Sequence, residues 1–262
     1  PKYAMDAHEA PVNVVVPFYR SYFVVSGGDD QRLIVWNAQT GERVRELRGH
    51  TDAVTAINIT PDGSHIVSGG RDKTLRVWNT ITGAMQHTFT GHASAIHAIA
   101  ISPDSRYAIA GETGTSEHNY TLRVYDIQQG QLVRTFPDYH AGVNYIRFLA
   151  NGELLLSAST EGDLKLWDWQ TGKVRRTIET HLGSMLMTLL PDERHIIAGT
   201  QKPVLVLWDL TTGHQSAKLD EPSDWVSALV YTQQGKQLIV GCHDGTLNIY
   251  GLRDREPTKP NT

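Results

Sequence analysis

The sequence predicts an all-β chain assembled from repeated sheets of four short antiparallel strands. A pattern of roughly 40 residues recurs from one end of the chain to the other. In the clearest copy, Gly49 to His92, four short stretches alternate apolar with polar residues or are rich in β-branched residues. Turn-forming residues separate each stretch from the next. These three observations favour strands joined by tight turns.

The clearest copy places its strands in order along the chain. Pro61-Asp62-Gly63, Gly70 to Lys73 and Thr80 to Gly83 are turn sequences. Gly83 suits a backbone position at positive φ, which glycine adopts without steric cost. The strands are therefore expected at Val54–Ile59, His65–Gly69, Leu75–Asn79 and Met85–Phe89.

Alignment on this copy gives six repeats. The first five begin at a histidine and carry an aromatic residue about 30 positions later; these pairs are His8 and Trp36, His50 and Trp78, His92 and Tyr125, His140 and Trp167, and His181 and Trp208. The sixth repeat lacks the histidine, but Trp225, GKQLIVG and TLNIY match its first three strands. The repeats span residues 8–49, 50–91, 92–139, 140–180, 181–219 and 220–254, and we expect residues 1–262 to form one domain.

The glycine-histidine start, followed by S-G-G-x-D-x-T-L-R-V-W in Ser68 to Trp78, resembles the signature of the WD-repeat family. The resemblance covers nearly the whole chain. It implies a β-propeller of four-stranded antiparallel blades, with six repeats detected and a seven-bladed or longer array as the alternative. The copies also resemble the propellers of NACHT-type or apoptosome-type multidomain proteins, so we expect this chain to be part of a larger protein or complex.

The sixth repeat lacks a fourth strand of its own. The residues after Tyr250 include Pro257 and Pro260, which cannot donate the hydrogen bonds that a strand requires. The segment Lys2–Met5 lies just before His8, where a fourth strand would precede the next blade. We therefore expect residues 1–7 to close the last blade and protect its edge.

Histidine, serine, an acidic residue and an aromatic residue recur together and superficially suggest hydrolase triads. In the resembling family these positions form a hydrogen-bonded chain, which satisfies buried polar groups within each blade. Because the set repeats, whereas an active site is unique, we interpret it as structural and predict no catalytic residue. The tetrads are His8, Ser26, Asp30 and Trp36; His50, Ser68, Asp72 and Trp78; and His140, Ser157, Glu161 and Trp167.

The later repeats depart from this pattern. The fifth has Ala198 in place of serine and Lys202-Pro203 at its turn, and the sixth has Val240 in place of serine. Blades five and six are therefore expected to be less rigidly braced than blade two.

Composition excludes several classes of function. The net charge is -4 and no basic stripe is interleaved with aromatic residues, so we expect no nucleic-acid partner. No apolar run is long enough to cross a membrane. The histidines fit no metal motif, no phosphate-binding loop is present, and no cofactor is expected. Cys242 is the only cysteine, which favours a reducing compartment, the cytoplasm or alternatively the nucleus.

The resemblance implies that one end of the blades is built from the entries to the first strands and the turns between second and third strands. We call this end the loop face, and we expect the partner-binding residues there. The candidates there are Asn13, Thr55, His97, Asn144, Met185, Trp225, Ser227, Asp29, Arg71, His118 and His243. Trp225 is either an interface anchor or a residue that packs the sixth blade. An insertion, Gly111–Thr121, is either a recognition loop or a neutral surface insertion.

The sequence thus favours a non-catalytic scaffold or regulatory domain that binds a protein or peptide. One alternative is a substrate receptor of a ubiquitin ligase complex. Another is a propeller enzyme with a site at the channel mouth, although the predicted channel-facing strands are mostly apolar and repetitive.

Overall fold

The computed structural model describes residues 8–19, 21–113, 120–139, 141–149, 152–180, 182, 186–199, 202–220, 222–232 and 236–251. Its described elements are all strands, arranged in six antiparallel sheets, which we call blades 1 to 6 in chain order. The predicted all-β propeller fold, built from four-stranded antiparallel blades, is confirmed. The chain separates into two compact units, Pro1–Thr177 and Ile178–Thr262, which are described in turn.

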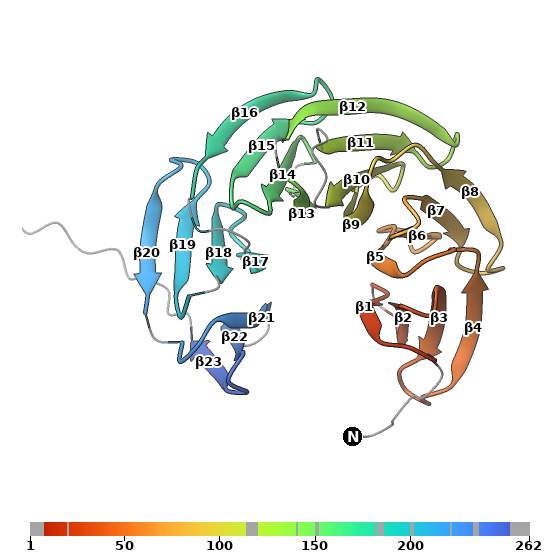
Figure 1. The fold of residues 1–262 in the computed structure, drawn as a ribbon, viewed down its shortest axis with the longest axis horizontal. Coiled ribbons are helices and arrows are strands. Elements are labelled where there is room, and N and C mark those ends of the chain that lie inside the picture. The colour runs from red at the N-terminus through yellow and green to blue at the C-terminus, as the bar shows by residue number, and fades with distance from the viewer. Residues whose placement is uncertain are drawn as a thin grey trace, which may run out of the picture. The chain divides into compact units, whose positions relative to one another are not determined.

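Unit 1 contains blades 1 to 4, each a sheet of four strands that follow one another in sequence (Figure 1). Blade 1 is β1 (Val12–Pro17), β2 (Phe23–Gly28), β3 (Arg32–Asn37) and β4 (Arg43–Arg48); blade 2 is β5 (Val54–Ile59), β6 (His65–Gly70), β7 (Leu75–Asn79) and β8 (Met85–Phe89); blade 3 is β9 (Ala95–Ile101), β10 (Tyr107–Thr113), β11 (Tyr120–Asp126) and β12 (Gln131–Tyr139); blade 4 is β13 (Val143–Phe148), β14 (Leu154–Ser159), β15 (Leu164–Asp168) and β16 (Lys173–Ile178).

The strands of blade 2 lie where the sequence predicts them, with β6 one residue longer than expected. Gly83 has φ of +74° in the turn before β8, as its sequence context requires. One expectation is corrected in blade 3, where Gly111, Glu112 and Thr113 belong to β10 and Thr121 to β11. Strand pairing therefore continues into both ends of the predicted insertion, and residues 114–119 lie outside the described part of the chain.

Blades within unit 1 pack through the first strand of one blade against the second and third strands of the blade before it. Leu75 and Val77 of β7 are fully buried and share one apolar core with Ile96 and Ile99 of β9. Gly69 makes this approach possible, because a Cβ atom there would lie 2.5 Å from Ile96 Cγ2. The same arrangement joins blade 1 to blade 2 and blade 3 to blade 4.

Unit 2 contains blades 5 and 6. Blade 5 is β17 (Leu186–Leu189), β18 (His195–Gly199), β19 (Leu205–Asp209) and β20 (Gln215–Leu219), and blade 6 is β21 (Val226–Thr232), β22 (Gln237–Cys242) and β23 (Leu247–Gly251). Val226 of β21 packs over Gly199 of β18, and both blades contribute to one apolar core. The described part of blade 6 has three strands. Residues 1–7, expected to complete this blade, lie outside the described residues, and the single-domain expectation likewise stays a prediction.

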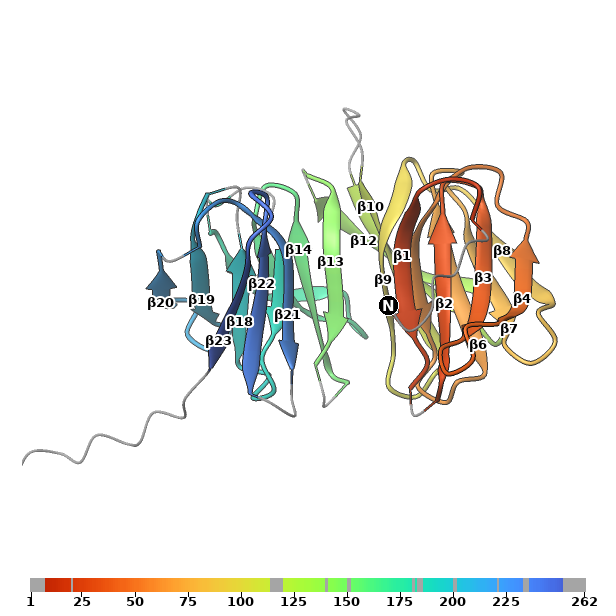
Figure 2. The same cartoon turned by 90° about the horizontal axis from the view of Figure 1, so that it is seen from below.

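The strands of each unit run between two ends, and the connecting turns gather there (Figure 2). At one end lie the entries to the first strands and the turns between second and third strands, which form the loop face. Backbone hydrogen bonds tie these two sets together: Asp29 N donates to Pro11 O, Arg71 N to Ala53 O, Thr160 N to Gly142 O and His243 N to Trp225 O, at 2.6 to 2.9 Å. The fold therefore holds the two groups of predicted binding residues side by side.

Candidate functional site

A β-bulge marks the loop-face end of the first strand in five blades. In blades 1, 2, 4 and 6 the pairing register shifts across the second residue of the strand, and in blade 3 it shifts across His97. A bulge leaves one residue out of the ladder and redirects its side chain. The bulged residues are Asn13, Thr55, His97, Asn144 and Ser227, each of which the sequence places among the binding candidates.

Two bulged side chains hold neighbouring blades of unit 1 together. Asn13 Nδ2 donates to Val54 O of blade 2 at 3.1 Å and to Asp29 Oδ1 at 2.7 Å. Thr55 Oγ1 donates in the same way to Ile96 O of blade 3. These contacts use the polar groups of Asn13 and Thr55 to link blades, which leaves them less available to a partner.

His97 differs, because its hydrogen bond stays within its own blade. Its Nδ1 lies 2.5 Å from Thr113 Oγ1, and the ring retains solvent exposure. Partial desolvation of the ring and the positive charge of Arg71 lower the pKa of His97. Arg71 is exposed, and no ion pair of its guanidinium occurs among the described residues. The two side chains thus offer a neutral imidazole beside an exposed cation.

Asn144 continues this part of the loop face in blade 4. Its Oδ1 atom is buried and has no hydrogen-bond partner within the described part of the chain. A buried acceptor without a donor is costly, which makes the amide a candidate for a hydrogen bond from a bound group.

Unit 2 presents an aromatic pair on its loop face. The rings of Trp225 and His243 lie 4.6 Å apart at 39°, and Trp225 is 40% exposed. Ser227 Oγ donates to Gly241 O at 3.1 Å in the same blade. Trp225 therefore packs against His243 in a tilted contact and keeps part of its ring exposed, and its role as an interface anchor stays a prediction.

Among the remaining candidates, His118 and Met185 lie outside the described residues, as does His140 of the fourth tetrad. Glu161 of that tetrad is exposed in the turn after β14. The indole Nε1 of Trp167 donates to Ser157 Oγ at 2.7 Å.

The first and second tetrads are continuous hydrogen-bonded chains. In blade 2, Trp78 Nε1 donates to Ser68 Oγ at 2.9 Å, Ser68 Oγ lies 2.8 Å from His50 Nε2, and His50 Nδ1 lies 2.8 Å from Asp72 Oδ2. A carboxylate only accepts, so the proton of the imidazole lies on Nδ1 and Ser68 donates to Nε2. Blade 1 repeats the chain through His8, Ser26, Asp30 and Trp36 at 2.7 to 2.9 Å.

These chains satisfy every polar atom along them and leave no group poised to attack a substrate. Burial, the largest single effect, would raise the pKa of Asp72, but the hydrogen bonds from His50, Thr51 N and Thr74 and the charge of His50 together outweigh it and hold the pKa of the carboxyl well below its usual range. Ser68 and His50 are themselves buried. The arrangement braces the turn against the sheet and offers no access for a substrate.

Blade 3 replaces this chain by a different one, which the sequence pattern does not reveal. Ala110 stands where blades 1, 2 and 4 have serine, and Tyr125 Oη donates directly to His92 Nε2 at 2.8 Å. His92 Nδ1 donates to Glu112 Oε1 at 2.7 Å, so Glu112 takes the role of the aspartate from inside β10. Burial of the phenol raises the pKa of Tyr125 to about 12. Glu112 has a longer side chain than the aspartate of blades 1 and 2, and the hydroxyl of Tyr125 contacts His92 directly. Together they replace the contacts that the serine makes in the other two blades.

The described residues of blade 5 show no such compensation. The indole Nε1 of Trp208 is buried and has no hydrogen-bond partner among the residues that the structure describes. The place of Ser68 and Ser157 is taken in the neighbouring strand β18 by Ala198, which lacks their hydroxyl. The expected weaker bracing of this blade therefore has a specific physical basis.

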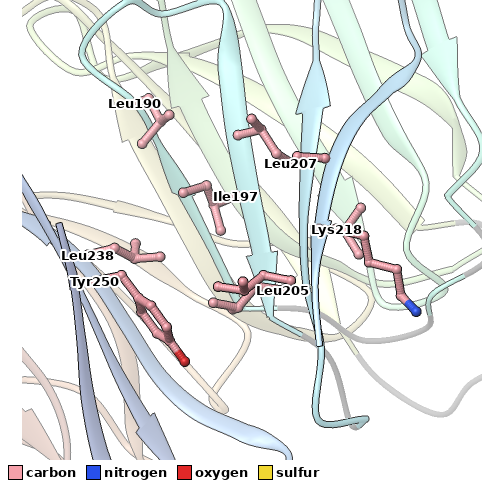
Figure 3. A pocket seen from close by; sticks show the side chains of 10 residues that line it. Leu190, Ile197, Leu205, Leu207, Lys218, Leu238 and Tyr250 are labelled. Carbon is pink, nitrogen blue, oxygen red and sulfur yellow. The ribbon is translucent and has the colours of Figure 1, made fainter. Parts of the chain in front are cut away.

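An apolar cavity of about 230 Å³ lies within unit 2 (Figure 3). Leu190, Ile197, Leu205 and Leu207 of blade 5 line one side, and Leu238 and Tyr250 of blade 6 line the other. Tyr250 occupies the place of Trp78 and is smaller, which leaves part of the space unfilled. The walls supply almost no polar group to orient a substrate, so we interpret the cavity as a packing gap.

Within the described residues, no group of three His, Cys, Asp or Glu side chains could hold a metal ion. No helix in this part of the chain has the length and hydropathy to cross a bilayer.

The repeat pattern matches a known family. The WD domain, G-beta repeat model matches residues 1–37, 41–79, 83–126, 130–168 and 213–251. The chain belongs to the WD40 repeat family. A WD repeat-containing protein 55 homolog from Aedes aegypti is 26% identical over 144 residues, which cover 55% of this chain and 31% of that protein.

Other WD40 relatives match with similar identity. The COMPASS component SWD3 of Saccharomyces cerevisiae is 25% identical over 52% of this chain and 46% of its own length. The nuclear distribution protein PAC1 of Arthroderma otae is 25% identical over 83% and 40%. The chain thus spans less than half the length of these curated relatives. The crystal structure of the computationally designed Ika8 protein superposes with a TM-score of 0.78 at 26% identity, covering 94% of this chain and 73% of that one.

Proposed function

We propose that this WD40 chain is a non-catalytic interaction module that binds a protein or peptide partner through its loop face. The observation that carries the proposal is the recurring β-bulge, which redirects a side chain at the loop-face end of each described first strand except β17. The rest of each blade repeats, whereas these positions carry four different residue types in five blades: Asn, Thr, His, Asn and Ser. A rigid scaffold with variable rim residues is suited to recognition.

Two groups of residues are the proposed contacts. In unit 1 they are Arg71, His97 and Asn144, which combine a cation, an imidazole and an unpartnered amide oxygen. In unit 2 they are Trp225 and His243, which supply apolar area with polar edges.

The absence of catalysis belongs to the same proposal. The histidine, serine and acidic residues that could resemble a triad are engaged in bracing chains within blades 1 and 2. One relative's name places it in the COMPASS assembly, which is consistent with a protein partner for this chain. We propose that the chain acts in the cytoplasm or nucleus, with neither nucleic acid nor membrane as its partner.

The test is capture of protein partners from extract by the wild-type chain and by the separate variants Arg71→Ala and Trp225→Ala. Tyr22→Ala is the matched control, because Tyr22 is an exposed aromatic residue in the turn between β1 and β2, at the opposite end of the strands. We expect a partner retained by Tyr22→Ala and lost from at least one loop-face variant. Equal capture by all four proteins would refute the loop face as the binding surface.

A further inference from the structure

A pocket of about 370 Å³ lies between blades 3 and 4, at the opposite end of the strands from the loop face. Both blades belong to unit 1 and share one apolar core, so the pocket is formed within a single unit. Residues of β10, β11 and β12 line one side, and the turn after β15 lines the other. The volume falls in the range of about 300 to 1,000 Å³ that is typical of ligand-binding pockets.

Aromatic rings form the apolar part of this pocket. The rings of Tyr107 and Trp169 lie 5.2 Å apart, and Phe148 packs edge-on against Trp169 at 5.4 Å. The indole Nε1 of Trp169 donates to Gly152 O at 2.7 Å, which fixes the orientation of the ring. The equivalent positions in blades 1, 2, 3 and 5 carry smaller side chains, namely Ala38, Thr80, Ile127 and Leu210. The wide aromatic wall is therefore a feature of this junction and not of the repeat.

Two arginines lie at the edge of the aromatic wall. Arg106 is ion-paired with Asp126 at 2.8 Å, and its guanidinium lies 5.0 Å from the centre of the Tyr107 ring. Arg134 is exposed, and its Nη1 donates to Thr171 O at 3.1 Å. Its guanidinium forms no ion pair within the described part of the chain. The other N–H groups of Arg134 are therefore available to an anion.

The hydroxyl of Tyr107 adds a second available donor. Among the residues that the structure describes, this hydroxyl makes no hydrogen bond, although the ring is partly buried. Asp104 also lines the pocket, but its Oδ1 already accepts from Ser102 Oγ at 2.5 Å and from Arg106 N at 3.1 Å. The donors left on this wall, from Arg134 and Tyr107, suit a carboxylate, because hydrogen bonds to an ionised acceptor are the stronger kind.

We propose that this pocket binds an acidic peptide, with a carboxylate held by Arg134 and the Tyr107 hydroxyl and a neighbouring apolar side chain packed on Trp169. A planar guanidinium matches the two oxygens of a carboxylate. The aromatic wall supplies the apolar area that anchors a peptide side chain, and Val133, which is 51% exposed, extends it. The pocket lies away from the loop face, so it is a second binding surface whose test does not depend on the first.

Proton–nitrogen correlation NMR on the full chain measures occupancy through the indole N–H of Trp169, which is assigned by comparison with Trp169→Phe. The probe is the capped dipeptide acetyl-Phe-Asp-amide, titrated to roughly 10 mM so that millimolar binding is detected. We expect a saturable shift of this signal. Acetyl-Phe-Asn-amide and acetyl-Phe-Lys-amide should bind about tenfold more weakly, because they lack the negative charge that pairs with Arg134.

Two variants test the two donors separately. Arg134→Gln should weaken binding of the acidic dipeptide about tenfold, and Tyr107→Phe about threefold. Because the Tyr107 hydroxyl has no partner among the described residues, Tyr107→Phe leaves the fold intact and decides the question should Arg134→Gln unfold.

The matched control is Arg45→Gln. Arg45 is the equivalent arginine of β4, and its Nη1 donates to Ile81 O of blade 2 as that of Arg134 does to Thr171 O. This variant should bind the acidic dipeptide like the wild type. The proposal is overturned if the Trp169 signal shows no saturable shift, if the three dipeptides bind equally or the lysine dipeptide binds best, or if the folded donor variants keep the affinity of the wild type.

Discussion

Ser68→Ala tests whether the hydrogen-bonded chain in blade 2 is structural. The substitution removes the acceptor of the Trp78 indole and the donor to His50 Nε2, and all three residues are buried. Each buried polar group left without a partner costs about 1 to 3 kcal/mol. Two groups lose their partner, so the free energy of opening blade 2 should fall by about 2 to 6 kcal/mol.

Native-state hydrogen exchange measures this loss locally. Amides of β6 and β7 should exchange faster in Ser68→Ala, while those of unit 2 serve as an internal reference. The control is Ser94→Ala, a half-buried serine in the same unit whose hydroxyl makes no hydrogen bond among the described residues. Its effect should stay within about 0.5 kcal/mol. If Ser68→Ala costs no more than this control, the bracing interpretation is wrong.

Three further predictions follow from the same contacts. Ala198→Ser gives the buried indole of Trp208 an acceptor and should raise the opening free energy of blade 5 by about 1 kcal/mol in hydrogen exchange. The pKa of Asp72 in the folded protein lies below its unfolded value of about 3.9. The stabilisation that Asp72 contributes is therefore fully present above about pH 3.9 and is lost as the pH falls toward the folded pKa. The difference in free energy of unfolding between wild type and Asp72→Asn should accordingly shrink from pH 5 to pH 3. Tyr125, whose pKa burial raises to about 12, should remain a phenol at pH 11 by ultraviolet absorbance, and ionisation near pH 10 would contradict its hydrogen bond to His92.

Most of the fold could be predicted from the sequence repeat. Strand positions in blade 2 follow from alternation and turn residues, because each strand has one face against a neighbouring blade and its turns need Gly, Asp or Asn. The tetrads of blades 1 and 2 could be predicted because they recur with fixed spacing. The hydrogen-bonded chain in blade 3 could not, since Glu112 stands where the first two repeats have Gly28 and Gly70, and it lies in β10 next to an insertion that shifts the alignment.

The candidate site was predictable as a set of positions but not as a set of roles. Sequence spacing placed Asn13, Thr55 and His97 at equivalent points, yet it could not show that the first two donate to the next blade while the third bonds to Thr113. Such differences depend on where a bulge aims each side chain.

At the loop face, some side chains link neighbouring blades and others remain available to bind a partner. This difference ranks the candidate binding residues. A side chain that donates to the next blade loses that donor for a partner, as Asn13 and Thr55 do. Among the described residues, the side chain of His97 bonds within its own blade and Arg71 forms no ion pair, while Trp225 packs against His243 and stays 40% exposed. Partner specificity should therefore depend on His97, Arg71 and Trp225, whereas substitutions at Asn13 or Thr55 should first loosen the contact between blades. A variant such as Thr55→Val would separate the two effects, because it keeps the shape of the side chain and removes its hydrogen bonds to Ile96 O and Gly69 O.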